Sequence, residues 1–359
     1  MNTYLDERFA ALEEYTPGEQ PKDQAYIKLN TNESPYAPGP ATVAAVADAA
    51  AATRLRLYSD PDSTKLKRAI AGLYGVESSN VFVSNGSDDI LNFVFMGFCG
   101  KGVMFPEISY GFYEVFAELH GTDFVKVPLK EGFVIDPEDY VGKNKTVVIA
   151  NPNAPTGRAI TLDDISRIAG ANGREPVIID EAYVDFGGTT AVELTREFDN
   201  LLVVQTFSKS RSLAGARLGF ALGSKTLIRD LEKLKYSTNP YNVNSVTAAA
   251  GTAAIGENGY YMENCSRIAA TREWTVEKLT ELGFQVIPSL ANFIFVKNDV
   301  IDGERLYREL KERKILVRHF GSEAIRQYNR ITIGTRDEME KLVAEIGDII
   351  DDGGKEPGQ

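Results

Sequence analysis

The arrangement of apolar residues between Val81 and Tyr241 constrains the fold of this chain more than any other feature. Short runs of four to seven residues, rich in β-branched and aromatic side chains, alternate there with amphipathic stretches. The runs read VFVS, GVMF, TVVIA, PVIID and LLVVQTF, and turn signals bound each of them. Buried strands alternate with helices in this way when a mostly parallel sheet is covered on both faces. The pattern therefore predicts an α/β domain.

The segments before and after this region have a different character. An alanine-rich stretch, ATVAAVADAAAAT, precedes it and predicts a helix. A helical region over residues 259–282, three strand-like runs and a final helix follow it. A chain of 359 residues has room for two domains of ~150 residues each. We expect residues 46–254 to form a large domain, residues 1–45 to supply an arm and part of a small α+β domain, and residues 255–359 to complete the small domain.

Charge and residue usage exclude several classes of protein. The formal net charge of −12 repels phosphate backbones and anionic lipids, so we expect no nucleic-acid partner and no membrane partner. Two histidines, His120 and His319, and two cysteines, Cys99 and Cys265, are too few for a disulfide framework or a Cys/His zinc site, so we expect no metal. No apolar run approaches the ~20 residues that span a bilayer, and MNTYLDERFA does not resemble a signal peptide. These features are typical of a cytoplasmic enzyme.

Polar residues follow four of the apolar runs at the point where each run ends. NGSDD (85–89) follows VFVS, NPNAPTG (151–157) follows TVVIA, EAY (181–183) follows the Asp180 that ends PVIID, and Ser208-Lys209 follows LLVVQTF. Because the carboxyl ends of parallel strands share one edge of a sheet, these residues are expected to meet in one crevice. Loops are polar in most proteins, so each motif alone is weak evidence for a binding site. Together they indicate a ligand that needs one lysine, one aspartate and several phosphate donors.

Ser87, Asp88, Ser208 and Arg217 are candidates for binding a phosphate. Ser87 and Asp88 lie where a strand passes into a helix, and the free N–H groups and helix dipole at such a junction favour an anion. An ordinary helix N-cap would explain the same two residues. Arg217 can clamp a phosphate through two hydrogen bonds, although a surface ion pair is the simpler explanation of a single arginine.

Lys209 and Asp180 are the candidate reactive residues. Lys209 directly follows an apolar run, where its amine would act as a nucleophile. Most lysines are simply solvated, so the neighbouring residues decide between these two interpretations. Asp180 ends a buried run, and a carboxylate there needs a cation or hydrogen-bond donors. A protonated pyridine nitrogen meets that need. Tyr183 offers a phenol to a ring hydroxyl, and Tyr110 offers an aromatic face for a flat cofactor or packs in the core.

These residues resemble the fold-type I, aspartate-aminotransferase-like family of pyridoxal 5′-phosphate (PLP) enzymes, and most closely its histidinol-phosphate aminotransferase branch. The similarity extends from YTPGEQP through LNTNESP, NPNAPTG, DEAY and SKSRSLAGARLG to RITIGT. DEAY and the lysine-to-arginine motif are specific for the superfamily, and the first two segments indicate the branch. The resemblance implies a mostly parallel seven-stranded sheet between helices in the large domain, together with a small α+β domain.

The resemblance also implies the chemistry of an aminotransferase. Lys209 would form an aldimine with PLP and, once released, carry the proton between the substrate Cα and the cofactor C4′. Asp180 would keep the ring nitrogen protonated, and Tyr183 and an asparagine would hold the ring hydroxyl. The family commonly has a second asparagine where this chain has Ala154, so we assign the asparagine contact to Asn153.

The remaining site residues follow from the same resemblance. The phosphate would lie among Ser87, Asp88, Ser208 and Arg217, with Tyr110 stacked on the ring. Tyr58 matches a tyrosine that reaches the cofactor phosphate of the neighbouring subunit, which implies a homodimer with a shared site. Tyr15, Asn32, Arg318 and Arg330 would contact the substrates, histidinol phosphate and the pair glutamate and 2-oxoglutarate. In a chain of this net charge, two arginines suit a phosphate dianion.

Interpretations outside this branch stay open. An aromatic amino-acid aminotransferase and a threonine-phosphate decarboxylase have similar sequences overall. A non-catalytic regulator with a PLP fold would carry a DNA-binding segment, which the charge of this chain disfavours. A nucleotide-dependent oxidoreductase is disfavoured because no G-x-G-x-x-G follows a strand.

Overall fold

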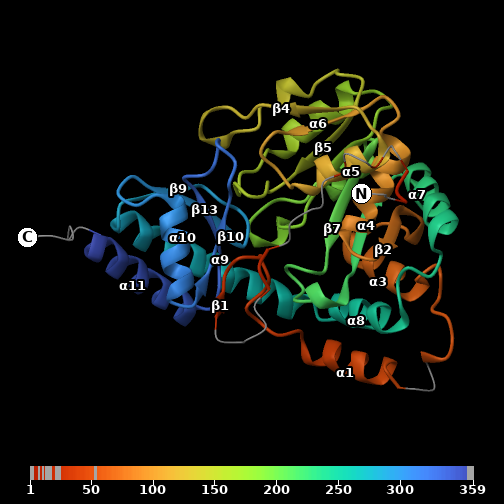
Figure 1. Cartoon of the computed structure of the whole chain (residues 1–359). Coiled ribbons are helices and arrows are strands. Elements are labelled where there is room, and N and C mark those ends of the chain that lie inside the picture. The colour runs from red at the N-terminus through yellow and green to blue at the C-terminus, as the bar shows by residue number, and fades with distance from the viewer. Residues whose placement is uncertain are drawn as a thin grey trace, which may run out of the picture.

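Figure 1 shows the computed structural model of the chain, which describes residues 4–6, 9, 12, 18–20, 26–51 and 55–353. A large sheet and the helices around it occupy one side of the molecule. A smaller sheet, with the helices of the C-terminal part of the chain, occupies the other side (Figure 1). This arrangement confirms the predicted fold class.

The large sheet has seven strands in the order β2-β8-β7-β6-β5-β3-β4. Their bounds are β2 (Val81–Ser84), β3 (Val103–Pro106), β4 (Phe124–Val127), β5 (Thr146–Ala150), β6 (Val177–Asp180), β7 (Leu201–Thr206) and β8 (Gly219–Gly223). β8 runs antiparallel to β2 and β7, and the other pairs are parallel. Every side chain of β2, β3, β5, β6 and β7 is buried, which explains why these strands read as continuous apolar runs.

Two strands of this sheet were not among the predicted runs. β4 lies at the sheet edge, and Val125 and Lys126 in it are exposed. β8 has the sequence GFALG, which contains no β-branched residue and has glycine at both ends. Its place in the sheet comes from pairing with β2 and β7 on either side, which a reading of local sequence does not reveal.

Helices cover both faces of the large sheet (Figure 1). They are α3 (Thr64–Tyr74), α4 (Ser87–Phe98), α5 (Phe112–His120), α6 (Leu162–Ala171), α7 (Lys225–Thr238) and α8 (Ser245–Gly256), and α1 (Pro40–Ala49) packs on α8. Apolar side chains of α3, α6 and α8 pack on one face and those of α4, α5 and α7 on the other. Helix starts have local causes: Pro40 opens α1, Asn244 caps α8, and Thr161 and Asp164 form a capping box at α6.

The smaller sheet is antiparallel, in the order β12-β13-β10-β9. Its strands are β9 (Phe284–Ile287), β10 (Phe293–Asn298), β12 (Arg318–His319) and β13 (Asn329–Thr332), and its helices are α9 (Asn258–Glu281), α10 (Gly303–Glu312) and α11 (Arg336–Gly353). A separate two-stranded sheet pairs β1 (Ile27–Lys28) in parallel with β11 (Ile315–Leu316). The segment after β1 is thereby fixed beside the C-terminal part of the chain.

The predicted domain boundaries fall within two helices that pack on each other. α1 spans the boundary at residues 45/46, α8 spans the boundary at 254/255, and the two helices lie side by side (Figure 1). The division into residues 1–45, 46–254 and 255–359 stays a prediction. For the site, the important fact is that β6 and β7 lie next to each other in parallel, so that Asp180 and Lys209 arrive at the same edge of the sheet.

Candidate active site

One cavity lies at the carboxyl ends of the central strands. Eight of the predicted site residues line it: Ser87, Asp88, Tyr110, Asp180, Tyr183, Ser208, Lys209 and Arg217. They come from four places in the chain, namely the start of α4, the loop before α5, the end of β6 and the loop after β7. The sheet therefore brings together the motifs that the sequence separates by more than a hundred residues.

Asp180 is the buried carboxylate of this cavity. It accepts hydrogen bonds from Tyr113 Oη at 2.8 Å and from the Ala182 amide at 3.3 Å. Burial raises the pKa of Asp180 from 3.8 to about 6, the negative charge of Asp88 adds to the rise, and Tyr113, Ala182 and Lys209 oppose it. A cation placed against this carboxylate would stabilise its ionised form, which burial disfavours.

Lys209 and Tyr183 lie beside each other above the sheet edge. The Lys209 Nζ is 5.7 Å from the centroid of the Tyr183 ring and donates to the Thr31 carbonyl at 3.1 Å. The Tyr183 ring meets Phe293 edge-on at 5.0 Å, and its hydroxyl accepts a hydrogen bond from Asn32 Nδ2 at 2.9 Å. The segment after β1 thus holds both side chains from the side of the smaller sheet.

The other end of the cavity suits an anion. α4 begins at Ser87 without a side-chain cap, so its first amide groups are available to a ligand. Arg217 Nη2 donates to Asp88 at 2.9 Å, and Asp88 also accepts from Tyr110 Oη at 2.8 Å. Gly86 has φ 89°, and a Cβ there would lie 2.7 Å from Arg217 Nη2. Glycine at this position therefore permits the guanidinium to approach the helix start.

A second cavity adjoins the first and contains the two predicted arginines. Tyr110, Ala154, Tyr183 and Lys209 line both cavities, while Arg318 and Arg330 line only the second. Both guanidinium groups lie over the ring of Phe320, at 5.7 Å and 5.9 Å. Arg330 also lies 5.4 Å from the Phe293 centroid and donates to the Asn30 carbonyl at 2.9 Å. An anionic group bound between them would be close to the Lys209 amine.

The residues of the first cavity fit PLP. Asp180 supplies a buried carboxylate for a ring cation, Tyr183 supplies a phenol and Lys209 supplies an amine for the aldehyde. The first amides of α4 and Arg217 supply donors for the phosphate. No cluster of His, Cys, Asp and Glu in the described part of the chain could hold a metal ion. Within the same residues, no helix is long and apolar enough to cross a membrane.

Comparison with known proteins identifies the family of this chain. The profile of the family described as aminotransferase class I and II matches residues 24–346. The chain belongs to the class I and II aminotransferase family. It is 49% identical to the histidinol-phosphate aminotransferase of Brachyspira hyodysenteriae and 48% identical to that of Marinomonas sp., covering 98% and 96% of this chain and 99% of each relative. The predicted family is therefore confirmed.

A solved structure extends the comparison to three dimensions. The histidinol-phosphate aminotransferase of Sinorhizobium meliloti, crystallised in complex with pyridoxal 5′-phosphate, superposes with a TM-score of 0.82 at 25% identity. The match covers 90% of this chain and 91% of that one. A tetra mutant of the Thermus thermophilus aspartate aminotransferase has the same fold, with a TM-score of 0.80 at 19% identity over 96% of this chain and 99% of that one.

Three predicted residues of this aminotransferase lie outside the two cavities or outside the described residues. Asn153 lines neither cavity: its side chain accepts from Ser109 Oγ at 2.7 Å and donates to the Ile108 carbonyl and Thr156 Oγ1. Its neighbour Ala154 lines both. Tyr58 is 83% exposed, and its ring stacks on Tyr241 at 4.5 Å. Tyr15 lies outside the described residues.

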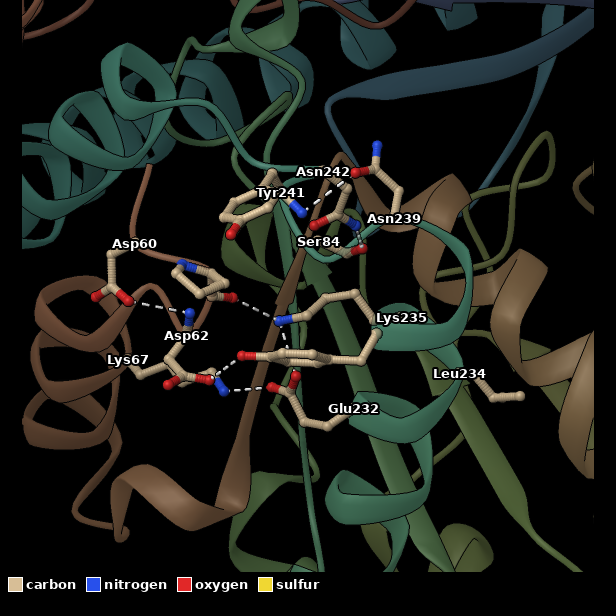
Figure 2. Close-up of polar contacts among 12 residues, drawn as sticks. Asp60, Asp62, Lys67, Ser84, Glu232, Leu234, Lys235, Asn239, Tyr241 and Asn242 are labelled. Atoms are coloured by element: carbon tan, nitrogen blue, oxygen red, sulfur yellow. Dashed lines mark hydrogen bonds and ion pairs between the residues drawn. The ribbon is translucent and has the colours of Figure 1, made fainter. Parts of the chain in front are cut away.

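The segment that carries Tyr58 is anchored by polar contacts of the residues after it with α7 (Figure 2). Lys235, which is 1% exposed, donates to the Pro61 carbonyl at 2.9 Å and pairs with Glu232 at 2.7 Å. Glu232 also pairs with Lys67, and Tyr236 Oη donates to Asp62 at 2.6 Å. Tyr58 is therefore exposed on a segment that is itself held in place.

Sequence reasoning missed the residues that hold the site from behind. Tyr113 was absent from the prediction because an aromatic residue inside an amphipathic helix is usually read as core packing. Thr31, Asn292 and Thr332 were absent because their contacts join segments 178, 260 and 300 residues apart, which no local pattern reveals. For Thr31, the one available signal was the polar content of the segment LNTNESP.

Glu181 is buried next to Asp180 but belongs to a different network. Its Oε1 accepts from the Ala191 amide at 2.6 Å, and its Oε2 accepts from Thr190 Oγ1 at 2.6 Å and Gln205 Nε2 at 2.8 Å. Burial raises the pKa of Glu181 from 4.5 to about 7, and the three hydrogen bonds offset only part of this rise. Glu181 is therefore a buried carboxyl that titrates near neutral pH.

Replacing Glu181 by glutamine should flatten the pH dependence of stability. A folded-state pKa above the unfolded value means that the neutral carboxyl stabilises the fold fully below pH 4.5, and that this contribution is lost as the pH rises through about 7. Over this range the free energy of unfolding of the wild type should fall by a few kcal/mol more than that of Glu181→Gln. Urea unfolding across the pH range measures it.

The matched control is Glu312→Gln, at an exposed position on α10, which should leave the pH dependence unchanged. Altered hydrogen bonds in Glu181→Gln would shift its free energy of unfolding by the same amount at every pH, without changing the slope of the plot against pH. Parallel curves for the wild type and Glu181→Gln would contradict the assignment of a raised pKa to Glu181.

Proposed function

We propose that the protein is a PLP-dependent histidinol-phosphate aminotransferase. It would interconvert histidinol phosphate and 2-oxoglutarate with imidazole-acetol phosphate and glutamate, a step of histidine biosynthesis. The observation that carries the proposal is the pair of adjoining cavities: one combines Lys209 with the buried Asp180, and the other places Arg318 and Arg330 beside the same lysine. The names of the relatives, at 45% to 49% identity over nearly the whole chain, support the same activity.

PLP supplies the electron sink for this reaction, and the chain supplies the groups around it. Lys209 Nζ would hold the cofactor through its aldehyde and, when free, would carry the proton between the substrate Cα and the cofactor C4′. Asp180 would keep a proton on the ring nitrogen, because a cation facing its buried carboxylate offsets the cost of burying the charge.

The other residues of the first cavity bind and orient the cofactor. Tyr183 donates to the ring hydroxyl, and Tyr110 covers a ring face. Ser87, Ser208, Arg217 and the amides at the start of α4, where Asp88 lies, bind the phosphate. The ion pair between Arg217 and Asp88 keeps the guanidinium at the anion end before the phosphate arrives. The contact that we assign to Asn153 requires its amide to leave Ser109 and Thr156.

Arg318 and Arg330 recognise the anionic ends of the substrates. Histidinol phosphate carries a phosphate and no carboxylate, whereas glutamate carries two carboxylates, so one pair of guanidinium groups would serve both in turn. The rings of Phe293 and Phe320 hold Arg330 in place, and the Asn30 carbonyl accepts from it. Asn32 lines the same cavity. Tyr15, outside the described residues, keeps its predicted substrate contact as part of this proposal.

Steady-state kinetics with histidinol phosphate, phenylalanine, tyrosine and threonine phosphate test the substrate, with 2-oxoglutarate as the amino acceptor. We expect the highest kcat/KM for histidinol phosphate. Arg330→Ala should lower kcat/KM for histidinol phosphate and glutamate alike, by roughly ten- to a hundredfold, because a charge-assisted hydrogen bond contributes about 1.5–3 kcal/mol. Arg318→Ala should impair the phosphate substrate more than glutamate.

The matched control is Arg326→Ala, which removes an exposed arginine of the same region that pairs with Glu323. It should leave both substrates unaffected. A wild-type preference for phenylalanine or tyrosine would make the protein an aromatic amino-acid aminotransferase. Release of carbon dioxide from threonine phosphate would make it a decarboxylase, and either result contradicts the proposed substrate.

The homodimer is part of this proposal. Tyr58 is exposed, anchored and outside both cavities of its own chain, as expected of a residue that completes the site of a second copy. Leu55 and Leu57 beside it are exposed as well, and an apolar surface of this kind suits an interface.

Hybrid dimers test the shared site. Lys209→Ala subunits lack the amine, and we expect Tyr58→Ala subunits to retain PLP poorly. In a hybrid of the two, one site combines an intact Lys209 with the intact Tyr58 of the other copy. Transaminase activity and PLP retention should therefore recover at one site per dimer. A hybrid no better than its parents, or a monomer by light scattering, would contradict the shared site.

A further inference from the structure

The hydroxyl of Tyr183 has a fixed hydrogen-bond direction. Its oxygen lies 2.9 Å from Asn32 Nδ2. An amide NH2 group only donates, so the Tyr183 oxygen must accept this bond. Among the described residues the phenol has no acceptor for its own proton, and its ring lines both cavities. The proton of Tyr183 is therefore left to point into the cavity.

The orientation of the Asn32 amide is itself determined by its neighbours. Thr332 Oγ1 accepts a hydrogen bond from the Asn32 backbone amide at 3.0 Å, so its single proton is free to donate to Asn32 Oδ1, also at 3.0 Å. Asn292 Nδ2 donates to the Asn32 carbonyl at 3.0 Å. In the opposite orientation Nδ2 would face Thr332 Oγ1, and the Thr332 proton would have no acceptor among the described residues, so Nδ2 faces Tyr183.

The anchors of Asn32 belong to the smaller sheet. Thr332 ends β13 and Asn292 directly precedes β10, and these two strands pair with each other. Asn32 is 1% exposed and has φ 58°, a backbone conformation that asparagine tolerates better than most residues. Hydrogen bonds fix the backbone amide, the backbone carbonyl and the side-chain Oδ1 of this buried residue, so its amide has little freedom to turn away from Tyr183.

We propose that Asn32 is a positioning residue that directs the Tyr183 hydroxyl proton into the cavity, so that the phenol acts as a donor to an oxygen of the bound cofactor. The inference rests on the proposed function and changes the role of Asn32 from a substrate contact to a group acting through Tyr183. A phenol that accepts one hydrogen bond also donates a stronger one, because hydrogen bonds in a chain polarise each other. The smaller sheet thereby affects cofactor binding indirectly, through Asn32 and Tyr183.

A purely structural role for Asn32 is the competing explanation. Asn32 joins the segment after β1 to the smaller sheet, so its loss could weaken PLP binding by loosening that segment. The two explanations differ in one respect. Positioning acts only through the Tyr183 hydroxyl, so it disappears when that hydroxyl is absent, whereas loosening of the segment does not.

A double-mutant cycle on PLP affinity separates them. We remove the cofactor from the wild type, Asn32→Gly, Tyr183→Phe and the double variant, and measure the PLP dissociation constant of each by titration. Glycine suits the φ of 58°, so the amide is removed without backbone strain. We expect Tyr183→Phe to weaken binding roughly tenfold or more and Asn32→Gly about fivefold. The double variant should lie within about twofold of Tyr183→Phe.

Asn32→Asp gives a second test, in which the hydrogen bond with Tyr183 reverses its direction. A carboxylate at this position accepts the Tyr183 proton instead of donating to its oxygen, so the phenol can no longer donate into the cavity. It keeps the size of asparagine and the acceptor for Thr332, and it therefore serves if Asn32→Gly does not fold. We expect Asn32→Asp to weaken PLP binding as much as Tyr183→Phe and to have little further effect in the Tyr183→Phe background. The absorption spectrum of bound PLP should change in the same way in both single variants.

Each outcome decides one statement. If Asn32→Gly or Asn32→Asp weakens binding by the same factor with and without the Tyr183 hydroxyl, the positioning role is wrong and Asn32 is structural. Unchanged PLP affinity in the Asn32 variants overturns it as well. If the wild type itself does not bind PLP, the proposed function fails, and the inference fails with it. If PLP binds and Tyr183→Phe has an effect while the Asn32 variants are additive, only the inference fails.

Discussion

A carboxylate buried at the end of a parallel strand is the constraint on which the rest of the site depends. Asp180 is 5% exposed, and two hydrogen bonds from Tyr113 and Ala182 do not offset the cost of burying its charge, which raises its pKa to about 6. A cation in the cavity lowers that cost. The protonated ring nitrogen of PLP is such a cation. Burial therefore destabilises the Asp180 carboxylate in the absence of PLP and favours the binding of PLP.

The geometry of the sheet sets what surrounds this carboxylate. The parallel pair β6 and β7 delivers Asp180 and Lys209 to one edge, and β2 leads into the helix start that suits a phosphate. The segment after β1 contributes from the other side through three consecutive residues. The Asn30 carbonyl accepts from Arg330, the Thr31 carbonyl accepts from Lys209, and Asn32 donates to Tyr183. The guanidinium of Arg330, the amine of Lys209 and the phenol of Tyr183 are thus held by one short segment.

Sequence reasoning found the strands whose local pattern is distinctive. Five buried strands were identified from apolar runs, and Asp180, Lys209 and Arg217 line one cavity, where their roles stay predictions. It failed for β8, whose glycine-flanked sequence becomes a strand only between two partners, and for Tyr113, whose helix position resembles core packing. It also could not find the contacts of Asn32 with Thr332, because nothing in the local sequence marks residues that meet across 300 positions.

Reduction of the loaded protein with borohydride tests the central claim, that this chain holds PLP through Lys209, most directly. Reduction fixes the bond between PLP and its lysine, and digestion with peptide mapping by mass spectrometry identifies the residue. The account predicts a pyridoxyl group on the peptide that contains Ser208 and Lys209, and its loss in Lys209→Ala. A label on another lysine, or no label after saturation with PLP, would contradict it.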